Sequence, residues 1–505
     1  MAAIQEEYKE KFEINKVKDS TLDPLTKKSR IQEVKKSFLT KKNSSIKTVF
    51  TIANTMVGSA IVVFPLIFAT SGLLTSLIVL CLVGAISCKT CLLEIIHFKM
   101  SEMDFPDAIK RILGKKWFIA YSACSVLLLY VTGMIYFTLI CNMLYPFLKY
   151  ILDSTGHSIA PMDSIEFGQF SFQYTGIIMI VVCFFLFSLK DLKVILKMGQ
   201  YGIIAIIVFF VYIVVRGFMN IPNITTDNVK IFTSDVANLC GVFALSFFIH
   251  NIIIPIMKNN REEKKNQRDV VTGYILTGLI YVVIGIFGTL SIAGVDLGGK
   301  KANTVLDYYT PDIGTAIIEI LLFLQLLTVE PIIWYVARSQ FFTLIYKNET
   351  VPQKYFVLSN ITFSASCLII QILNVDPTLI MSLDGAICGF LLVYIIPIKM
   401  HLKCMYTDPQ TIRQSLLRDE SPEETDNRPS IITTTEDGLK ISDLRVDKLE
   451  DEFGNHGKNN YACNSMHTER RGRIPKNLRY FFYLVLTLIG LAFAVIKIVN
   501  LALGK

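Results

Sequence analysis

The chain has 505 residues, of which 52% are hydrophobic and 18% are charged, and its formal net charge is +8. Its apolar residues are grouped in blocks of about 20, the length that an α-helix needs to cross about 30 Å of hydrocarbon. This pattern excludes a soluble globular protein and indicates a polytopic membrane protein. The net charge does not indicate a nucleic-acid partner, because the basic residues lie on the loops between the apolar blocks.

Eleven apolar segments are predicted to span the membrane, so the expected fold is an all-α membrane protein with 11 transmembrane helices. A surface-lying amphipathic helix is predicted before the third of them, over residues 104–117. The predicted spans are residues 46–69, 72–97, 117–148, 174–189, 194–219, 234–257, 271–293, 313–346, 353–373, 376–398 and 478–501.

The distribution of basic residues predicts the orientation of these spans. One set of connecting segments carries 40 lysine and arginine residues and the opposite set carries 6. Basic residues are retained in the cytosol, so the N-terminus is expected there and the C-terminus on the lumenal side. Asn223, in the sequence Asn223-Ile224-Thr225, then lies on the lumenal side as a candidate glycosylation site.

Two long polar segments lie outside the predicted spans. Residues 1–45 and 399–477 are rich in charged residues and poor in apolar ones, so both are predicted to be cytosolic and mostly disordered. They flank a predicted ten-helix core at 46–398, and residues 478–505 form the last helix and a short lumenal end. Residues 1–45 or 400–477 are candidates for binding a cytosolic signalling partner, and a solvated chain without a partner is the alternative.

Polar and small residues interrupt the first and sixth predicted spans, as NTMVGS (54–59) and HNIIIP (250–255). A helix can break at membrane depth only where other groups satisfy the freed backbone N–H and C=O groups. Two such spans, five apart, predict a pair of inverted five-helix repeats whose broken ends meet at the substrate site. An unbroken helix with a small-residue packing face is the alternative for 54–59.

No sequence motif supports an enzyme. The segment GVDLGGKK (294–301) is close to a phosphate-binding loop but has lysine where the loop needs serine or threonine, and no strand precedes it. The pair in CKTC (88–91) lies in an apolar helix without a second pair of ligands, and the small residues of GAICG (385–389) are typical of helix packing.

Four segments resemble the amino acid/auxin permease family, most closely its lysosomal, arginine-gated branch of sodium-coupled neutral amino acid transporters. The resemblance covers about residues 46–400 and the last span. It implies a five-plus-five inverted-repeat (LeuT-like) transporter fold with one extra helix, and sodium-coupled amino acid transport out of the lysosome. The four segments are NTMVGSAIVVFP (54–65), SFFIHNIIIPIMKNNREEKKNQRDV (246–270), TVEPIIWYVARSQ (328–340) and DGAICGFLLVYIIPI (384–398).

The resemblance also implies where substrate and ion bind. The substrate is expected on the backbone of the first break and against side chains near the sixth. The corresponding residues are Thr55, Met56, Val57, Gly58, Ser59, Phe248, His250 and Asn251. Sodium is expected between the carbonyls of Ala53 and Met56 and the hydroxyl of Thr328. A Thr328 hydroxyl bonded back to its own helix is the alternative.

Two carboxyl groups lie at membrane depth, Glu330 in the eighth span and Asp384 in the tenth. Ionisable residues there are functional candidates, and structural ion pairs, such as Glu330 with Arg338, are the alternative. His250 is a candidate proton carrier or a hydrogen-bonded core histidine.

These features predict a secondary active transporter of neutral or basic amino acids in a lysosomal, late endosomal or vacuolar membrane, with sodium as the coupling ion. Two alternatives remain open. One is an amino acid receptor that signals to the TORC1 pathway without transport, and the other is a proton-coupled vacuolar amino acid permease.

Overall fold

The structure is a computed structural model that describes residues 42–58, 60–98, 105–157, 160, 169–188, 202–225, 228–233, 236–297, 302–310, 312–346 and 351–407. Within these residues the chain forms helices and no β-strand, as the sequence predicted. In chain order the principal helices are α3 (Ser45–Val57), α4 (Ala60–Ser71), α5 (Leu73–Phe98), α6 (Phe105–Leu113), α7 (Lys115–Ser154), α8 (Phe172–Phe187), α10 (Gly202–Asn220), α11 (Val236–Ser246), α12 (Ile253–Lys258), α13 (Asn266–Ser291), α14 (Ile313–Tyr346), α15 (Gln353–Ile372), α16 (Pro377–Asp384), the π-helix η4 (Gly385–Ile395) and α17 (Ile396–Tyr406).

The described helices follow the first ten predicted spans in order. In this part of the chain, 7 helices are long and apolar enough to cross a membrane, and α3 and α4 make another such span bent by 59°. The helices α8 and α11 are shorter and apolar. The predicted eleventh span and most of both predicted tails, residues 1–41 and 408–477, lie outside the described residues, so the count of eleven stays a prediction.

Two predicted helix ends were wrong. The helix predicted to end at residue 148 continues to Ser154, and the one predicted to end at 398 continues to Tyr406. Both extensions carry charged residues such as Lys149 and Lys403. The reason is that helical hydrogen bonds form within the chain and do not stop where the apolar surroundings end.

The predicted amphipathic helix is confirmed as α6. Its apolar residues recur at three- and four-residue spacing, which places them on one face that packs on α7 and α17. The buried residues are Phe105, Ala108, Ile109 and Ile112.

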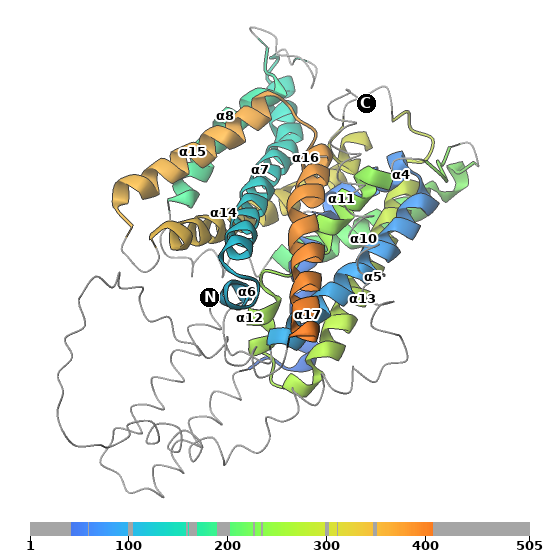
Figure 1. Ribbon diagram of the computed structural model, residues 1–505. Coiled ribbons are helices and arrows are strands. Elements are labelled where there is room, and N and C mark those ends of the chain that lie inside the picture. The colour runs from blue at the N-terminus through green and yellow to red at the C-terminus, as the bar shows by residue number, and fades with distance from the viewer. Residues whose placement is uncertain are drawn as a thin grey trace, which may run out of the picture.

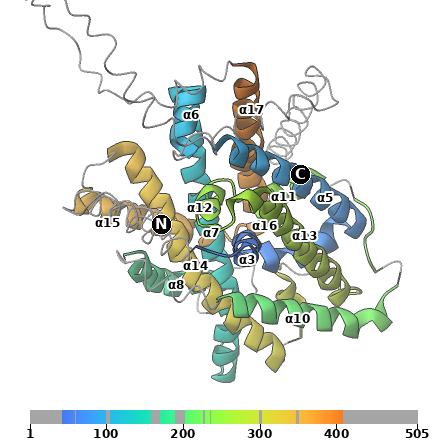
Figure 2. The same ribbon diagram turned by 90° about the horizontal axis from the view of Figure 1, so that it is seen from below.

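Two groups of helices surround the broken spans. The long helices α7 and α14 cross in extensive contact, and α8 and α15 lie side by side on their flank (Figure 1). The second group contains α5, α11 and α13, with the broken helix α3–α4 packed on α13. Figure 2 shows α3 in the middle of the bundle, between α13 and α14.

The tenth span approaches α11 backbone to backbone. A Cβ on Gly385 would lie 1.9 Å from the carbonyl oxygen of Gly241, and a Cβ on Gly241 would lie 2.2 Å from the carbonyl oxygen of Ser382. The packing role predicted for the small residues at 385–389 therefore holds for Gly385. At this contact the helix changes from α16 to the wider π-helix η4.

We expect Gly385→Ala to destabilise the protein, because the added methyl group meets a backbone oxygen that cannot rotate away. Overpacking of this kind costs about 1–3 kcal/mol. Gly278→Ala on α13 is the matched control, since a Cβ there meets nothing within 4 Å. Thermal unfolding of the purified variants in detergent measures the difference, and equal unfolding temperatures would contradict the proposed close contact.

Candidate substrate site

The first predicted break is present and lies at Gly58. The helix α3 begins after Ser44, whose hydroxyl accepts the Lys47 N–H at 3.4 Å, and ends at Val57. Gly58 has φ 31° and ψ −138°, a conformation that residues with a Cβ rarely adopt, and α4 resumes at Ala60. Ser59 lies outside the described residues.

The break is shorter than the sequence predicted. Residues 54–57 were expected to be part of the interruption, but they are helical. Thr55 donates its hydroxyl to the Thr51 carbonyl at 2.8 Å, so this side chain bonds within the helix rather than unwinding it.

The second predicted break is also present. The helix α11 ends at Ser246 and α12 begins at Ile253, and residues 247–252 between them are not in a regular helix. Pro255 lies in the first turn of α12, where its missing N–H removes no helical hydrogen bond.

Tyr281 of α13 lies between the two breaks and contacts both. Its hydroxyl donates to the carbonyl oxygen of Met56 at 2.7 Å and to that of Ser246 at 3.1 Å, and its side chain is fully buried. These carbonyls belong to the last turns of α3 and α11, where carbonyls have no partner within the helix. One shared hydroxyl proton therefore joins the inner ends of the two half-helices.

Small residues of α13 allow it to follow both halves of the broken first span. Three glycines on one face of α13 lie so close to α3 and α4 that a Cβ on any of them would approach a neighbouring atom to 2.6 Å or less. The contacting pairs are Gly273 with Ile52, Gly285 with Phe68, and Gly288 with Pro65. The helix α13 therefore supports the first span on both sides of its break.

Side chains of α5 and α13 satisfy the second break. The Phe247 carbonyl accepts hydrogen bonds from Ser87 at 3.1 Å and from Tyr274 at 3.2 Å. His250 Nε2 lies 3.0 Å from the hydroxyl of Thr90, and its Nδ1 has no partner among the described residues. His250 is buried with only 1% of its surface exposed, so here it is a hydrogen-bonded core histidine.

The cytosol-facing ends of the half-helices, in the predicted orientation, are also connected. The Asn43 N–H donates to the Asn259 carbonyl at 2.9 Å, and the Arg261 N–H donates to the Asn43 carbonyl at 2.8 Å. These contacts join the start of α3 to the chain that follows α12. The two half-helices are thus held together at both ends.

The remaining predicted substrate residues lie around the breaks. Thr55 is exposed, Met56 and Val57 are buried, and Asn251 is half-buried. Phe248 is also half-buried, and its ring stacks on that of His250 with 5.9 Å between centroids.

The polarity of the helix ends fits an α-amino acid. The C-terminal carbonyls of α3 and α11 carry partial negative charge, and the N-terminal N–H groups of α4 carry partial positive charge. Because α3 and α4 meet at Gly58, both polarities occur at the same interruption. An ammonium and a carboxylate on one carbon atom match this arrangement.

The predicted sodium ligands have other partners in this structure. The Met56 carbonyl accepts a hydrogen bond from the Tyr281 hydroxyl. The Thr328 hydroxyl donates to the Gln325 carbonyl of its own helix at 2.9 Å, which is the predicted alternative. Ala53 lies one residue before the last four carbonyls of α3, so its carbonyl is within the helical hydrogen-bond pattern. A carbonyl has a second lone pair, so Met56 remains able to bind a cation.

The two intramembrane carboxyl groups are buried without a cation beside them among the described residues. Glu330 is 0% exposed, Cys183 Sγ donates to its Oε2 at 3.5 Å, and its Oε1 has no partner. Asp384 is 5% exposed, and neither of its oxygens has a hydrogen-bond partner in the described part of the chain.

The ion pair of Glu330 with Arg338, the alternative to a functional role for Glu330, does not form. Arg338 donates instead to the Phe187 carbonyl at 2.9 Å and to Asn360 Oδ1 at 2.6 Å. The guanidinium also lies 4.0 Å from the centroid of the Phe356 ring. The sequence spacing of two helical turns allowed the pair, but a neighbouring helix supplied better acceptors.

Sequence reasoning missed Tyr281, Tyr274 and Ser87. Their signal was weak, because single hydroxyl groups in apolar helices commonly bond to their own helix. The spacing of Tyr281 from glycines 273, 285 and 288 places all four on one helix face, and a hydroxyl on such a face was the available clue.

Residues 41–419 match the family described as "Transmembrane amino acid transporter protein". The chain belongs to this family. The predicted resemblance is confirmed, and the protein is a secondary amino acid transporter of the membrane and not an enzyme.

Curated relatives carry related names. "Neutral amino acid transporter 9" of Xenopus laevis is 26% identical over 429 residues, covering 74% of this chain and 77% of the relative. "Sodium-coupled neutral amino acid transporter 9 homolog" of Caenorhabditis elegans is 23% identical over 422 residues, covering 72% and 68%. A solved structure titled "Inward facing conformation of Mhp1" matches with a TM-score of 0.45 and 10% identity, covering 70% of this chain and 77% of that one.

We expect Tyr281→Phe to destabilise the protein and to weaken amino acid binding, because it removes the donor from two buried carbonyls. A buried acceptor left without a donor costs about 1–3 kcal/mol. Tyr274→Phe is the matched control, since the Phe247 carbonyl keeps its bond from Ser87. Thermal unfolding and equilibrium binding of labelled amino acid measure both effects, and an equal or larger loss in Tyr274→Phe would contradict the role given to Tyr281.

Proposed function

We propose that the protein is a sodium-coupled symporter that moves neutral or basic amino acids out of the lysosome, late endosome or vacuole by alternating access. The observation that carries this proposal is the pair of helix breaks joined by Tyr281. Broken spans that meet at membrane depth are the structural basis of substrate sites in transporters of inverted-repeat architecture.

In this proposal the backbone recognises the groups that all α-amino acids share. The first N–H groups of α4 bind the carboxylate, and the carbonyls of residues 55–57 together with Ser246 bind the ammonium. The interruption at Gly58 exposes these groups, and Ser59 is proposed as a further substrate contact. Phe248, His250 and Asn251 then contact the amino acid side chain and determine which amino acid is selected.

The exposed face of α3 supports a conformation open to the cytosol. Ile46 is 72% exposed and Phe50 is 55% exposed, and Asn54 continues the same face one turn further on. Since α3 lies in the middle of the bundle (Figure 2), this face borders the interior of the protein rather than lipid.

A polar contact supports closure on the opposite side. The 3₁₀-helix η3 (Val305–Tyr308) carries Asp307, whose carboxylate accepts both Asn303 and Thr304 N–H groups at 2.9 Å. Asn142 of α7 donates to the same carboxylate at 3.3 Å. These bonds hold η3 over the lumenal end of α7, so we assign η3 to the outer gate.

Sodium is the proposed coupling ion because the relatives' names specify it and because carbonyls of a broken helix suit a hard cation. The proposed ligands are the carbonyls of Ala53 and Met56 and the hydroxyl of Thr328. Closure of α3 onto α14 would bring them together.

Proton coupling is the second candidate, and Glu330 favours it. An unpaired charge sealed from water is costly, so a carboxyl group in this environment is best accommodated as the neutral acid. The groups facing it from the neighbouring helices are thiols and not cations, namely Cys141, Cys183 and Cys367. Asp384 is a further candidate of the same kind.

Location and signalling remain part of the proposal. We place residues 1–45 and 399–477 in the cytosol, the C-terminus in the lumen, and a glycan on the lumenal Asn223, which lies exposed in a 3₁₀ turn. A receptor that signals to the TORC1 pathway through these tails would bind amino acid without moving it, so time-dependent uptake by the purified protein in liposomes distinguishes the two.

We expect Gly58→Ala to lose amino acid binding and uptake by at least about tenfold, equivalent to about 1.4 kcal/mol. The reason is that φ 31° and ψ −138° are strained for a residue with a Cβ, and this Cβ would also lie 2.9 Å from Tyr136 Oη. Gly156→Ala is the control, since Gly156 also has a positive φ but a Cβ there meets nothing within 4 Å. Normal binding and uptake by correctly inserted Gly58→Ala would exclude the break as the substrate site.

We expect Thr328→Val to raise the sodium concentration required for half-maximal uptake several-fold, because it removes one oxygen ligand. Thr343→Val, which removes a similar helix-bonded hydroxyl from α14, is the control. Sodium and pH are varied independently in proteoliposomes. If uptake does not depend on sodium but depends on the pH gradient, and if Glu330→Gln removes this pH dependence, the coupling ion is the proton and not sodium.

A further inference from the structure

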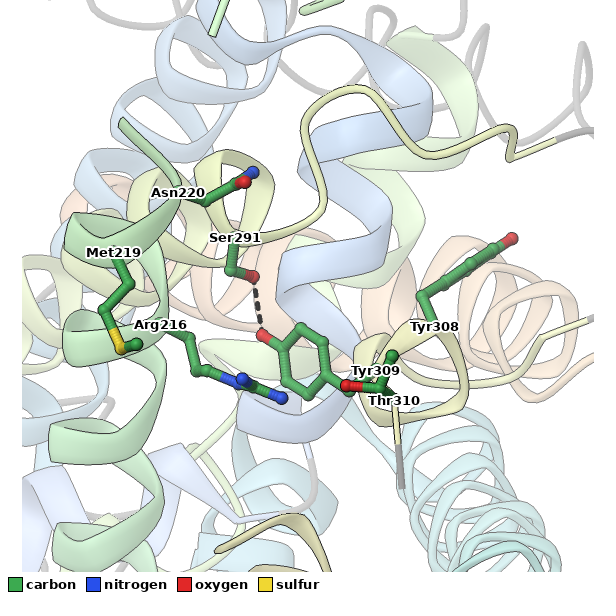
Figure 3. A pocket seen from close by; sticks show the side chains of 7 residues that line it. All are labelled: Arg216, Met219, Asn220, Ser291, Tyr308, Tyr309 and Thr310. Atoms are coloured by element: carbon green, nitrogen blue, oxygen red, sulfur yellow. Dashed lines mark hydrogen bonds between the residues drawn. The ribbon is translucent and has the colours of Figure 1, made fainter. Parts of the chain in front are cut away.

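A cavity of about 280 Å³ lies away from the helix breaks, at the C-terminal end of α10. Its walls come from α10, the end of α13, the last residue of η3 and residues 309–310 after it (Figure 3). In the predicted orientation this is the lumenal side, the same side as Asn223. The cavity therefore borders the proposed outer gate rather than the central site.

Arg216 is the charged group of this cavity. Its Nη2 lies 2.9 Å from Asp312 Oδ2, and its guanidinium carbon lies 4.8 Å from the centroid of the Tyr309 ring and 5.5 Å from that of Tyr212. Figure 3 shows the side chain reaching from α10 to the Tyr309 ring. Two aromatic rings and one carboxylate thus hold the guanidinium at the cavity wall.

The hydrogen-bonding capacity of Arg216 is not fully used. Its Nε is buried and has no acceptor among the described residues. A buried donor without an acceptor raises the free energy of the folded protein. A ligand oxygen that draws the guanidinium toward the cavity would recover this free energy.

Asp312 is fixed independently of Arg216. Its Oδ1 accepts the Thr315 N–H at 2.7 Å and the Thr315 hydroxyl at 3.0 Å, at the start of α14. The Thr315 N–H also holds the pKa of this carboxyl below its usual value, so Asp312 is negatively charged at neutral pH. The carboxylate therefore stays in place and charged if Arg216 moves.

The other polar groups of the wall are already paired with one another. The hydroxyls of Ser291 and Tyr309 lie 2.5 Å apart, and Asn220 Nδ2 donates to the carbonyls of Leu290 and Ala293. These bonds preform the wall. They leave Arg216, with Asp312 beside it at the edge of the cavity, as the group that can accept a charged ligand.

We propose that this cavity is a second amino acid site, which binds a zwitterionic α-amino acid from the lumenal side. The ligand carboxylate pairs with Arg216 and its ammonium group lies between Asp312 and the face of the Tyr309 ring. The ligand class rests on the proposed function, since amino acids are the substrates expected in that compartment.

Chemistry and size favour this ligand. A guanidinium binds a carboxylate through two parallel hydrogen bonds, and an ammonium group is attracted both by a carboxylate and by an aromatic face. A zwitterion supplies both charges and leaves neither member of the existing ion pair unpartnered. The cavity is slightly smaller than the range of about 300–1,000 Å³ typical of small-molecule pockets, which favours a single amino acid over a peptide or nucleotide.

Binding stoichiometry tests the proposal. Purified full-length protein is titrated with labelled leucine, and the parent is expected to bind two equivalents. Arg216→Gln and the cavity-filling Met219→Trp are each expected to bind one, because each leaves the central site intact. Lys230→Gln, which removes an exposed positive charge from the same side, should still bind two.

The failure of this proposal is distinct from failure of the central site. Two equivalents in both Arg216→Gln and Met219→Trp would overturn the second site. Gly58→Ala, which disrupts the central break, should still bind one equivalent of leucine. The double variant Gly58→Ala and Arg216→Gln should bind none. If the single variant Gly58→Ala loses all binding, the central site is the site that binds leucine and the cavity is excluded as a second site.

Competition in the Gly58→Ala variant tests the ligand chemistry. Unlabelled leucine is expected to displace labelled leucine, whereas 4-methylpentanoate, which lacks the amine, and isoamylamine, which lacks the carboxylate, should each compete at least about tenfold more weakly. Equal competition by 4-methylpentanoate would show an anion site and overturn the zwitterion assignment.

Discussion

The structure depends on the requirement that every backbone polar group freed at membrane depth finds a partner. Two spans are interrupted, at Gly58 and at residues 247–252, and each interruption leaves carbonyls without helical N–H donors. Tyr281 donates to one carbonyl from each interrupted helix, and Ser87 and Tyr274 donate to the carbonyl that follows. Without these hydroxyl groups the buried carbonyls would lack donors, which would destabilise both interrupted helices.

The same constraint explains why α13 packs so closely on both broken helices. A tyrosine hydroxyl can reach two carbonyls only if the helix that carries it lies close to both broken helices, and the glycines on its contact face permit this approach. The contacts of Asn43 with Asn259 and Arg261 join the same half-helices at their other ends. The two half-helices are therefore joined at both of their ends.

The central breaks and the Arg216 cavity use different means to accommodate charge. At the breaks the charges are partial and belong to the ends of helices, so the proposed recognition there depends on backbone geometry rather than on the ligand's side chain. In the cavity full charges of Arg216 and Asp312 are already paired, so a ligand must offer both signs at once to replace that pair. The proposed outer gate η3 ends at Tyr308, which lines the cavity, and it also contacts α4 of the first broken span.

The sequence by itself determined the membrane class, the order of the first ten helices, the amphipathic α6 and the presence of both interruptions. Each of these follows from local properties: the length of apolar runs, the helical spacing of apolar residues, and the clustering of residues such as Asn54 and Gly58 that favour helix ends. Only the tertiary structure decided that the first break is confined to the chain after Val57, that Arg338 binds Asn360 rather than Glu330, and that Tyr281 joins the two breaks. These outcomes depend on which helices lie side by side, and contacts between residues more than 200 positions apart, such as Tyr281 with Met56, leave no periodic pattern in the sequence.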